Sequence, residues 1–102
     1  MPVNLTKRTI DLLTGEGWVC ERVESANHHA KFDPFGFDLM GVRPGRTLGV
    51  QVTSASNASN RRKKLHANPK TRAWIDAGNE ALLLTWWKRN QKWAIHKREI
   101  IQ

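Results

Sequence analysis

The sequence predicts an α/β protein with one small mixed sheet flanked by helices. Segments with helical and strand patterns follow one another in the order helix, three strands, helix, two strands. The stretch GFDLMGVRPGRTLGVQVTS, residues 36–54, has the pattern of two short strands joined by a turn. The continuous apolar run EALLLTWW, residues 80–87, is typical of a buried strand. A single sheet with helices packed against it accounts for this order.

The first element is expected to be a helix over residues 5–14, because its leucines and its isoleucine fall roughly on one side. Asn4 or Thr6 is the candidate N-cap, and Gly15 and Gly17 are typical stop signals. A short amphipathic helix at the start of the chain follows from this pattern.

The next segments predict the first three strands. Residues 18–25, WVCERVES, have strand composition, and Glu21 shares a strand face with two valines, which favours an inward orientation. Residues 26–35 are expected to form a loop. Two strands then follow, over about 36–43 and 46–54.

The second half of the chain predicts a broken helix and two strands. A helix is expected over about 58–67, and Asn68 and Pro69 would restart it as N-cap and first helical residue. This second piece would end at Gly78, before the buried strand. The alternating segment KWAIHKREI at 92–100 predicts a half-exposed last strand.

Length and composition indicate one globular domain over residues 1–102. No apolar run approaches the roughly 20 residues that a membrane-spanning helix needs, and the N-terminus lacks the apolar centre of a signal peptide. The single cysteine, Cys20, excludes an internal disulfide framework and fits a reducing compartment. We therefore expect an intracellular protein with no membrane partner.

The charge is unevenly distributed along the chain. The net charge is +8, and no acid lies between Asp38 and Asp76. That interval carries the whole excess, in Arg43, Arg46, Arg61, Arg62, Lys63, Lys64, Lys70 and Arg72. Cations concentrated in this way indicate a surface for a polyanion, with nucleic acid as the first candidate. A solvated basic helix without a partner is the alternative.

The predicted hairpin places three polar residues on one face. If Pro44 and Gly45 form the turn, opposing positions sum to 89, and Asp38 lies opposite Gln51. Thr53 is on the same face, two residues further on. A three-residue loop would shift this register by one. The opposite face would hold the apolar residues Phe37, Leu39, Val50 and Val52.

An acid and a second side-chain oxygen in this position can share a hard cation. Directly opposed residues have Cβ atoms roughly 4.5–5.5 Å apart. Mg²⁺ prefers oxygen ligands and often needs only one or two protein groups together with a substrate phosphate. The alternative is that Asp38 and Gln51 are ordinary solvated strand residues.

The order of elements and this hairpin together resemble the PD-(D/E)xK nuclease superfamily, and within it the small archaeal and phage Holliday-junction-resolvase-like enzymes. The family has a restriction-endonuclease-like α-β-β-β-α-β core. Its Asp, at the start of the second strand, falls on Asp38 of GFDLMGV, and its Glu-x-Lys motif falls on Gln51, Val52 and Thr53 of GVQVTS. The likeness covers about residues 5–88.

The resemblance implies an endonuclease that hydrolyses DNA phosphodiester bonds with Mg²⁺ or Mn²⁺, with branched DNA such as Holliday junctions as the candidate substrate. It implies a homodimer in the cytoplasm or nucleoid, or in the host cytoplasm if the protein is phage-encoded. The implied metal ligands are Asp38, the Gln51 amide oxygen and the Val52 carbonyl. Gln51 replaces the usual Glu and Thr53 the usual Lys, which weakens the expected cation binding and activation of water.

Other residues are candidates to replace these groups. Some members of the family take a lysine from the following helix, and Lys63 or Lys64, with Lys64 first, would supply it here. Glu21 or Glu24 would supply a further carboxylate, with Glu21 favoured by its strand face. Asp33 lies near the strand entry and could instead cap the turn.

Binding of the DNA backbone is expected to fall on the basic segment after the hairpin. Phosphate contacts of this kind give salt-dependent affinity and little sequence reading. The candidate residues are Arg61, Arg62, Lys63, Lys64, Lys70 and Arg72. Two alternatives stay open, a catalytically impaired nucleic-acid-binding protein on the nuclease fold and a basic RNA-binding module.

The histidines and tryptophans carry weaker signals. His28 and His29 follow the first strand and could approach a phosphate, but their spacing to His66 and Cys20 matches no standard zinc pattern. The five tryptophans suggest base stacking, although most are expected in the core, and Trp93 is the one most open to an interface role.

Overall fold

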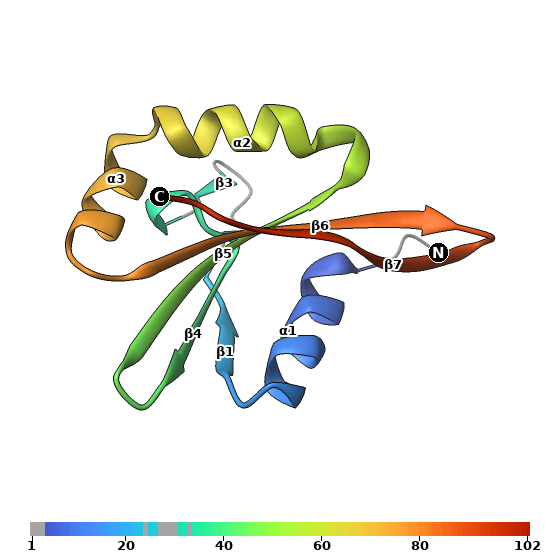
Figure 1. The fold of residues 1–102 in the computed structure, drawn as a ribbon, viewed down its shortest axis with the longest axis horizontal. Coiled ribbons are helices and arrows are strands. Elements are labelled where there is room, and N and C mark those ends of the chain that lie inside the picture. Colours follow the sequence, from blue (N-terminus) through green and yellow to red (C-terminus); the bar gives the residue numbers. More distant parts are fainter. Residues whose placement is uncertain (1–3, 24, 27–30, 33) are drawn as a thin grey trace.

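The computed structural model describes residues 4–23, 25–26, 31–32 and 34–102. A five-stranded sheet in the order β1-β4-β5-β6-β7 forms its centre (Figure 1), and β5 and β6 are parallel while the other neighbours are antiparallel. The elements are α1 (Leu5–Gly15), β1 (Val19–Arg22), β2 (Ser25–Ala26), β3 (Lys31–Phe32), a 3₁₀ turn η1 (Pro34–Gly36), β4 (Leu39–Arg43), β5 (Arg46–Ser54), a 3₁₀ turn η2 (Ala55–Asn57), α2 (Ala58–Ala67), α3 (Pro69–Asp76), β6 (Glu80–Arg89) and β7 (Lys92–Ile100).

The predicted fold class is confirmed. The protein is an α/β protein with one mixed five-stranded sheet, helices on both faces of the sheet, and the expected order of its main elements. Two details differ from the sequence prediction. β1 is shorter than the segment expected to form it, and β2 pairs with β3 as a two-residue ladder inside the region expected to be a loop.

The helices begin where the sequence predicts them to begin. The Asn4 side chain caps α1 by accepting a hydrogen bond from the Lys7 backbone N–H at 2.9 Å. The Asn68 side chain caps α3 in the same way, accepting from the Lys70 N–H at 2.9 Å, and Pro69 is the first helical residue. Asn68 also ends α2, so this residue reorients the chain from α2 into α3.

The helices cover opposite faces of the sheet. On the α1 face, Leu13 packs with a buried cluster from the strands, including Leu39, Val50, Leu84 and Trp86. On the α2 face, Leu65 of α2 packs with a second cluster, and α3 adds Trp74 and Ile75 at its edge. Figure 1 shows α1 on one side of the strands and α2 with α3 on the other.

The predicted hairpin register is confirmed. Arg43 pairs with Arg46 and Leu39 with Val50, so opposing positions sum to 89 along the whole ladder of β4 and β5. Gly45 has a φ of +74°, a left-handed value that favours glycine at the second turn residue. The next pair beyond the ladder is Asp38 and Gln51.

Phe37 does not lie on the face that strand alternation predicts for it. The prediction grouped it with Leu39 and Val50, but Phe37 belongs to the cluster on the α2 face. It precedes β4 and leaves η1, where Phe35 and Gly36 have φ values of 57° and 89°, so the alternation does not extend to it. Its ring covers Gly49, where an added Cβ would lie 2.4 Å from the ring.

The tryptophans largely take core positions, as expected. Trp86 is 6% exposed and donates its indole N–H to the Thr9 hydroxyl of α1 at 2.9 Å. Trp93 is half-buried against the cluster on the α1 face. Beyond Ser54, the last residue of β5, β6 pairs with β7 alone and the two form a protruding hairpin (Figure 1).

No helix within the described residues has the length and apolar character needed to cross a membrane.

Candidate functional site

The backbone of Asp38 is held from both sides. Its N–H donates to the Val50 carbonyl at 2.9 Å, and its carbonyl accepts from the Val23 N–H at 3.0 Å. Its carboxylate continues the hydrogen bonding to β5 beyond the last backbone pair, because Oδ2 accepts the Val52 N–H at 2.8 Å. The Asp38 side chain is therefore fixed at the junction of β4 and β5.

Gln51 completes this centre. Its Nε2 donates to Asp38 Oδ2 at 2.6 Å and to the Val52 carbonyl at 3.3 Å. Both partners only accept hydrogen bonds, so the amide must present its NH₂ group to them. Asp38 is 7% exposed and Gln51 5%, which overturns the alternative that they are solvated strand residues. We call Asp38, Gln51 and the Val52 backbone the Asp38 centre.

Two further candidate residues, Thr53 and Glu21, differ in burial: Thr53 is buried and Glu21 is exposed. Thr53 is 6% exposed on the α2 face, and its hydroxyl donates to the Ser54 carbonyl at 3.3 Å. Glu21 is paired with Met40 and lies on the same face of the sheet, but it is exposed and not directed into a core. The expected inward orientation of Glu21 is wrong, because the buried side of β1 is carried by Cys20.

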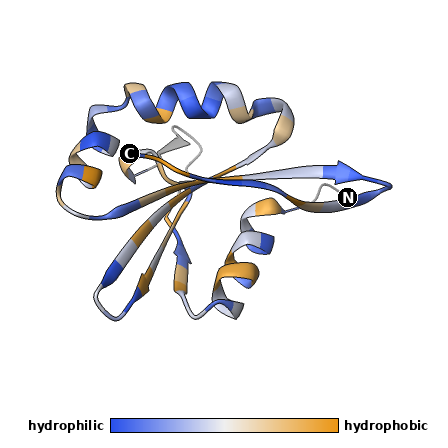
Figure 2. Ribbon diagram, viewed as in Figure 1, coloured by the Kyte–Doolittle hydropathy of each residue, from blue (hydrophilic) through white to orange (hydrophobic). Residues whose placement is uncertain are grey.

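The basic helix α2 has a buried side and an exposed side. Ala58 and Leu65 are buried against the sheet, and at about 100° per residue Arg61 and Arg62 flank the line between them. Arg61 and Arg62 are half-buried, while Lys63 and Lys64 are exposed. Figure 2 shows α2 as a mostly hydrophilic helix.

The ion pair with Glu99 shows on which side of the Asp38 centre Arg62 lies. Glu99 of β7 pairs with Leu83 of β6, and Leu83 pairs with Gln51, so these residues form one row across the sheet. Arg62 Nε donates to Glu99 Oε2 at 2.6 Å, at the β7 end of this row. The opposite flank of α2, with Arg61 and Lys64, is thus directed towards the end of the row where Asp38 lies.

Intramolecular ion pairs use some of the predicted DNA-binding cations. Arg62 is engaged by Glu99, and Arg72 approaches Asp76 at 3.6 Å and donates to the Gln102 carbonyl at 2.8 Å. Among the residues that the structure describes, no ion pair engages Arg61, Lys63, Lys64 or Lys70. These four are the cations of α2 and α3 available to a polyanion.

Four of the residues considered from the sequence lie outside the described residues. These are Glu24, His28, His29 and Asp33.

The donor chemistry of the Asp38 centre suits a hard cation only in part. The Asp38 carboxylate and the Val52 carbonyl supply oxygens of the kind that Mg²⁺ prefers, whereas the Gln51 amide turns its nitrogen towards both. Within the described ranges no group of three or more His, Cys, Asp or Glu side chains could hold a metal ion. The described residues of the centre therefore supply one anionic ligand and do not form a complete cation site on their own.

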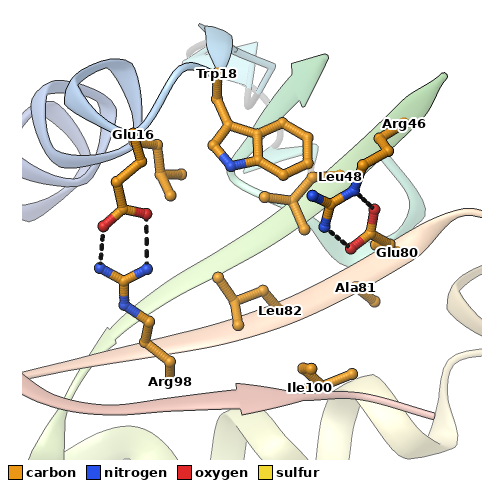
Figure 3. Close-up of a pocket in the computed structure, with 10 residues that line it drawn as sticks. Glu16, Trp18, Arg46, Leu48, Glu80, Ala81, Leu82, Arg98 and Ile100 are labelled. Carbon is orange, nitrogen blue, oxygen red and sulfur yellow. Dashed lines mark hydrogen bonds and ion pairs between the residues drawn. The ribbon is translucent and has the colours of Figure 1, made fainter. Parts of the chain in front are cut away.

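A separate pocket of about 270 Å³ lies on the α1 face of the sheet (Figure 3). Its apolar wall includes Trp18 and Leu48, and two ion pairs stand at its sides. Arg46 contacts Glu80 at 2.6 Å, and Arg98 contacts Glu16 at 2.5 Å. These hydrogen bonds lower the pKa of the Glu80 and Glu16 carboxyls. The pocket is on the other side of the sheet from the α2 face and shares no residue with the Asp38 centre.

The Holliday junction resolvase Hjc of Archaeoglobus fulgidus, an archaeal hyperthermophile, superposes with a TM-score of 0.56 at 16% sequence identity. The match covers 90% of this chain and 73% of that one. The chain shares the fold of this resolvase. No protein family and no curated protein matches it by sequence.

The different positions of Arg61 and Arg62 were not predicted from the sequence. Of two adjacent arginines in α2, Arg62 is tied to the sheet and Arg61 is not. The spacing of Ala58 and Leu65 identifies the buried line of the helix and so places the two arginines on opposite flanks, but it does not show which flank meets an acid. The pairing with Glu99 had no local signal, since 37 positions separate the partners.

Proposed function

We propose that this protein is a DNA-binding endonuclease that acts on branched DNA, with the Asp38 centre as its active site. The observation that carries the proposal is the buried Asp38 carboxylate on the side of the sheet covered by a helix with unpaired cations. Burying a carboxylate has a free-energy cost unless hydrogen bonds offset it, and here Gln51 and Val52 provide them. The likeness to a resolvase fold supports the same function.

In this proposal the cations position the DNA and Asp38 faces the phosphate. Arg61 and Lys64, on the flank of α2 towards Asp38, would hold the backbone of the strand that is cut. Phosphate contacts by such groups fix orientation without reading the sequence. Asp38, the Gln51 amide oxygen and the Val52 carbonyl would hold Mg²⁺ or Mn²⁺, which polarises the phosphate and lowers the pKa of a bound water.

A second candidate function is binding of branched DNA without cleavage. One observation favours it: the Gln51 amide nitrogen, and not an oxygen, contacts Asp38 Oδ2. No lysine follows on β5, where Thr53 donates to the Ser54 carbonyl. Binding without cleavage needs only the cations of α2 and α3 and no metal.

We also propose that the protein acts as a homodimer. Val19 and Val42 pair across β1 and β4, and they are 71% and 50% exposed on the α2 face beyond the cover of the helices. An exposed apolar pair of this kind is suited to contact with a second copy of the chain.

A cleavage and binding assay separates the candidates. Wild type and Asp38→Ala are incubated with duplex, single-stranded and four-way-junction DNA, with single-stranded RNA as the comparison, in Mg²⁺, Mn²⁺ or EDTA. The proposal expects metal-dependent cleavage of junction DNA by the wild type and none by Asp38→Ala. Equal cleavage by both proteins would exclude the Asp38 centre as the active site.

The same assay reports on the alternatives. Junction binding in EDTA with no product at any enzyme concentration would establish the second candidate function. Tighter binding of RNA than of any DNA, unaffected by Asp38→Ala, would instead indicate a basic RNA-binding module.

A further inference from the structure

The Asp38 centre contains a closed set of three contacts. Gln51 Nε2 lies 2.6 Å from Asp38 Oδ2 and 3.3 Å from the Val52 carbonyl oxygen. The Val52 N–H donates to the same Oδ2 at 2.8 Å. One amide nitrogen therefore bridges a carboxylate oxygen and a carbonyl oxygen in a buried position.

An amide NH₂ group and a divalent cation satisfy such oxygens in the same way. Each offers positive charge to two lone pairs at once, through two N–H donors in one case and two metal–oxygen bonds in the other. The NH₂ group carries only partial charge, but it needs no dehydration and is supplied by the chain itself. The two occupants exclude each other at this position, because the bridging nitrogen is already at hydrogen-bond distance from both oxygens.

We infer that the Gln51 side-chain amide takes the place of a divalent cation in the DNA-free protein, and that this residue sets the cation affinity of the Asp38 centre. Cation binding requires the amide to turn its oxygen inward and to give up both hydrogen bonds. The free protein is accordingly closed to Mg²⁺ and Mn²⁺. The inference concerns the centre of the proposed function, but its test uses no DNA and no activity.

Replacing the Gln51 amide by a carboxylate should favour the divalent cation over the side chain at this position. In Gln51→Glu the bridging donor is lost and two carboxylates face each other in a buried site. Like charges so placed repel each other and destabilise the fold. A divalent cation relieves the repulsion, so the variant gains a cation site that the wild type lacks.

The experiment measures Mn²⁺ binding by calorimetry and by thermal unfolding, with metal-free protein and no DNA. Gln51→Glu should melt below the wild type in EDTA, and its melting temperature should rise by about 5 °C or more in saturating Mn²⁺. Its Mn²⁺ affinity should exceed that of the wild type by at least about tenfold, since a second carboxylate is added. The melting temperature of the wild type should not rise in Mn²⁺, and calorimetry should detect no Mn²⁺ binding at this centre.

Gln51→Leu is the matched control. It also loses the bridging donor and should melt below the wild type, but it adds no ligand and should gain nothing from Mn²⁺. Asp38→Asn in the Gln51→Glu background should abolish the gain. Mn²⁺ binding by the wild type that equals the binding by Gln51→Glu and disappears in Asp38→Asn would overturn the inference. So would a folded Gln51→Glu protein that gains no stability from Mn²⁺.

A second measurement on the wild type alone covers the case in which Gln51→Glu does not fold. The side-chain amide protons of Gln51 should give NMR signals protected from exchange, because they are buried and bonded to Asp38 and Val52. These signals should be unaffected by Mn²⁺ at concentrations that leave the bulk spectrum unchanged. Selective broadening at Gln51 and Val52 would show that the cation displaces the amide, against the inference. Loss of cleavage alone, with these results intact, would count against the proposed function and not against this role of Gln51.

Discussion

Arg62 of α2 and Glu99 of β7 form an ion pair at 2.6 Å, at one end of the cross-strand row that continues through Leu83 to Gln51. This pair orients α2 over the sheet. Because Arg62 is directed to the β7 end of the row, Arg61 occupies the flank directed to the Asp38 end. Adjacent arginines of one helix therefore have different roles, one in the fold and one at the surface that we assign to DNA.

The first prediction compares these two arginines. Arg61→Ala should weaken binding of junction DNA and reduce the slope of log affinity against log salt by about 1, because one phosphate contact is lost. Arg62→Ala should leave the slope nearly unchanged and lower the thermal stability, since Glu99 loses its partner. Fluorescence anisotropy across a salt series and thermal unfolding measure the two effects. A larger loss of salt slope in Arg62→Ala than in Arg61→Ala would contradict the assignment of the two flanks.

The second prediction concerns acid. The hydrogen bond from Arg62, with smaller contributions from Lys97, lowers the pKa of Glu99, although partial burial opposes this. A group whose pKa is lower in the folded state stabilises the fold above its unfolded pKa and loses this effect as the pH falls through the folded value. The stability of the wild type should therefore fall below about pH 4.5, and Glu99→Gln should reduce the fall. The contribution is expected at up to about 1 kcal/mol, because the pair is partly exposed. Urea unfolding between pH 3 and 7 measures it, and identical pH profiles for the two proteins would contradict it.

The third prediction tests the packing that holds the strand entry to the Asp38 centre. An alanine Cβ at Gly49 would lie 2.4 Å from the Phe37 ring, so Gly49→Ala should destabilise the protein by about 1–3 kcal/mol. Gly15→Ala is the matched control, because nothing lies within 4 Å of its added Cβ and the site is at the end of a helix. Its stability should stay within about 0.5 kcal/mol of the wild type or rise slightly. Chemical unfolding of both variants gives the comparison, and equal stabilities would show that Phe37 moves away at no cost.

The fourth prediction addresses the proposed homodimer. Val42→Glu places a charge in the exposed apolar pair with Val19, and it should weaken self-association by at least about tenfold. Ile100→Glu is the control, since Ile100 is 68% exposed but pairs with Leu82 on the α1 face. Sedimentation over a range of protein concentrations distinguishes the variants. A wild type that is monomeric at all concentrations would refute the dimer, and a stronger effect of Ile100→Glu would move the interface to the other face.

The sequence by itself determined the helices, the strands of the main sheet and the meeting of Asp38 with Gln51. Local signals suffice for these features. Asn68 caps α3 and Pro69 is its first residue, and the Pro44–Gly45 turn sets the pairing of the two strands that it joins. Once the turn is known, alternation brings Asp38 and Gln51 together.

The tertiary structure alone decided the orientation, the burial and the partners of the side chains. Strand alternation could not place Phe37, because the left-handed residues of η1 turn its ring over Gly49, on the opposite face. It could not show that Glu21 is exposed, since burial depends on which helix covers each face. The division between Arg61 and Arg62 depends on Glu99, which lies 37 residues from Arg62. The orientation of the Gln51 amide depends on two acceptors, Asp38 and Val52, that only the folded chain brings to the same nitrogen.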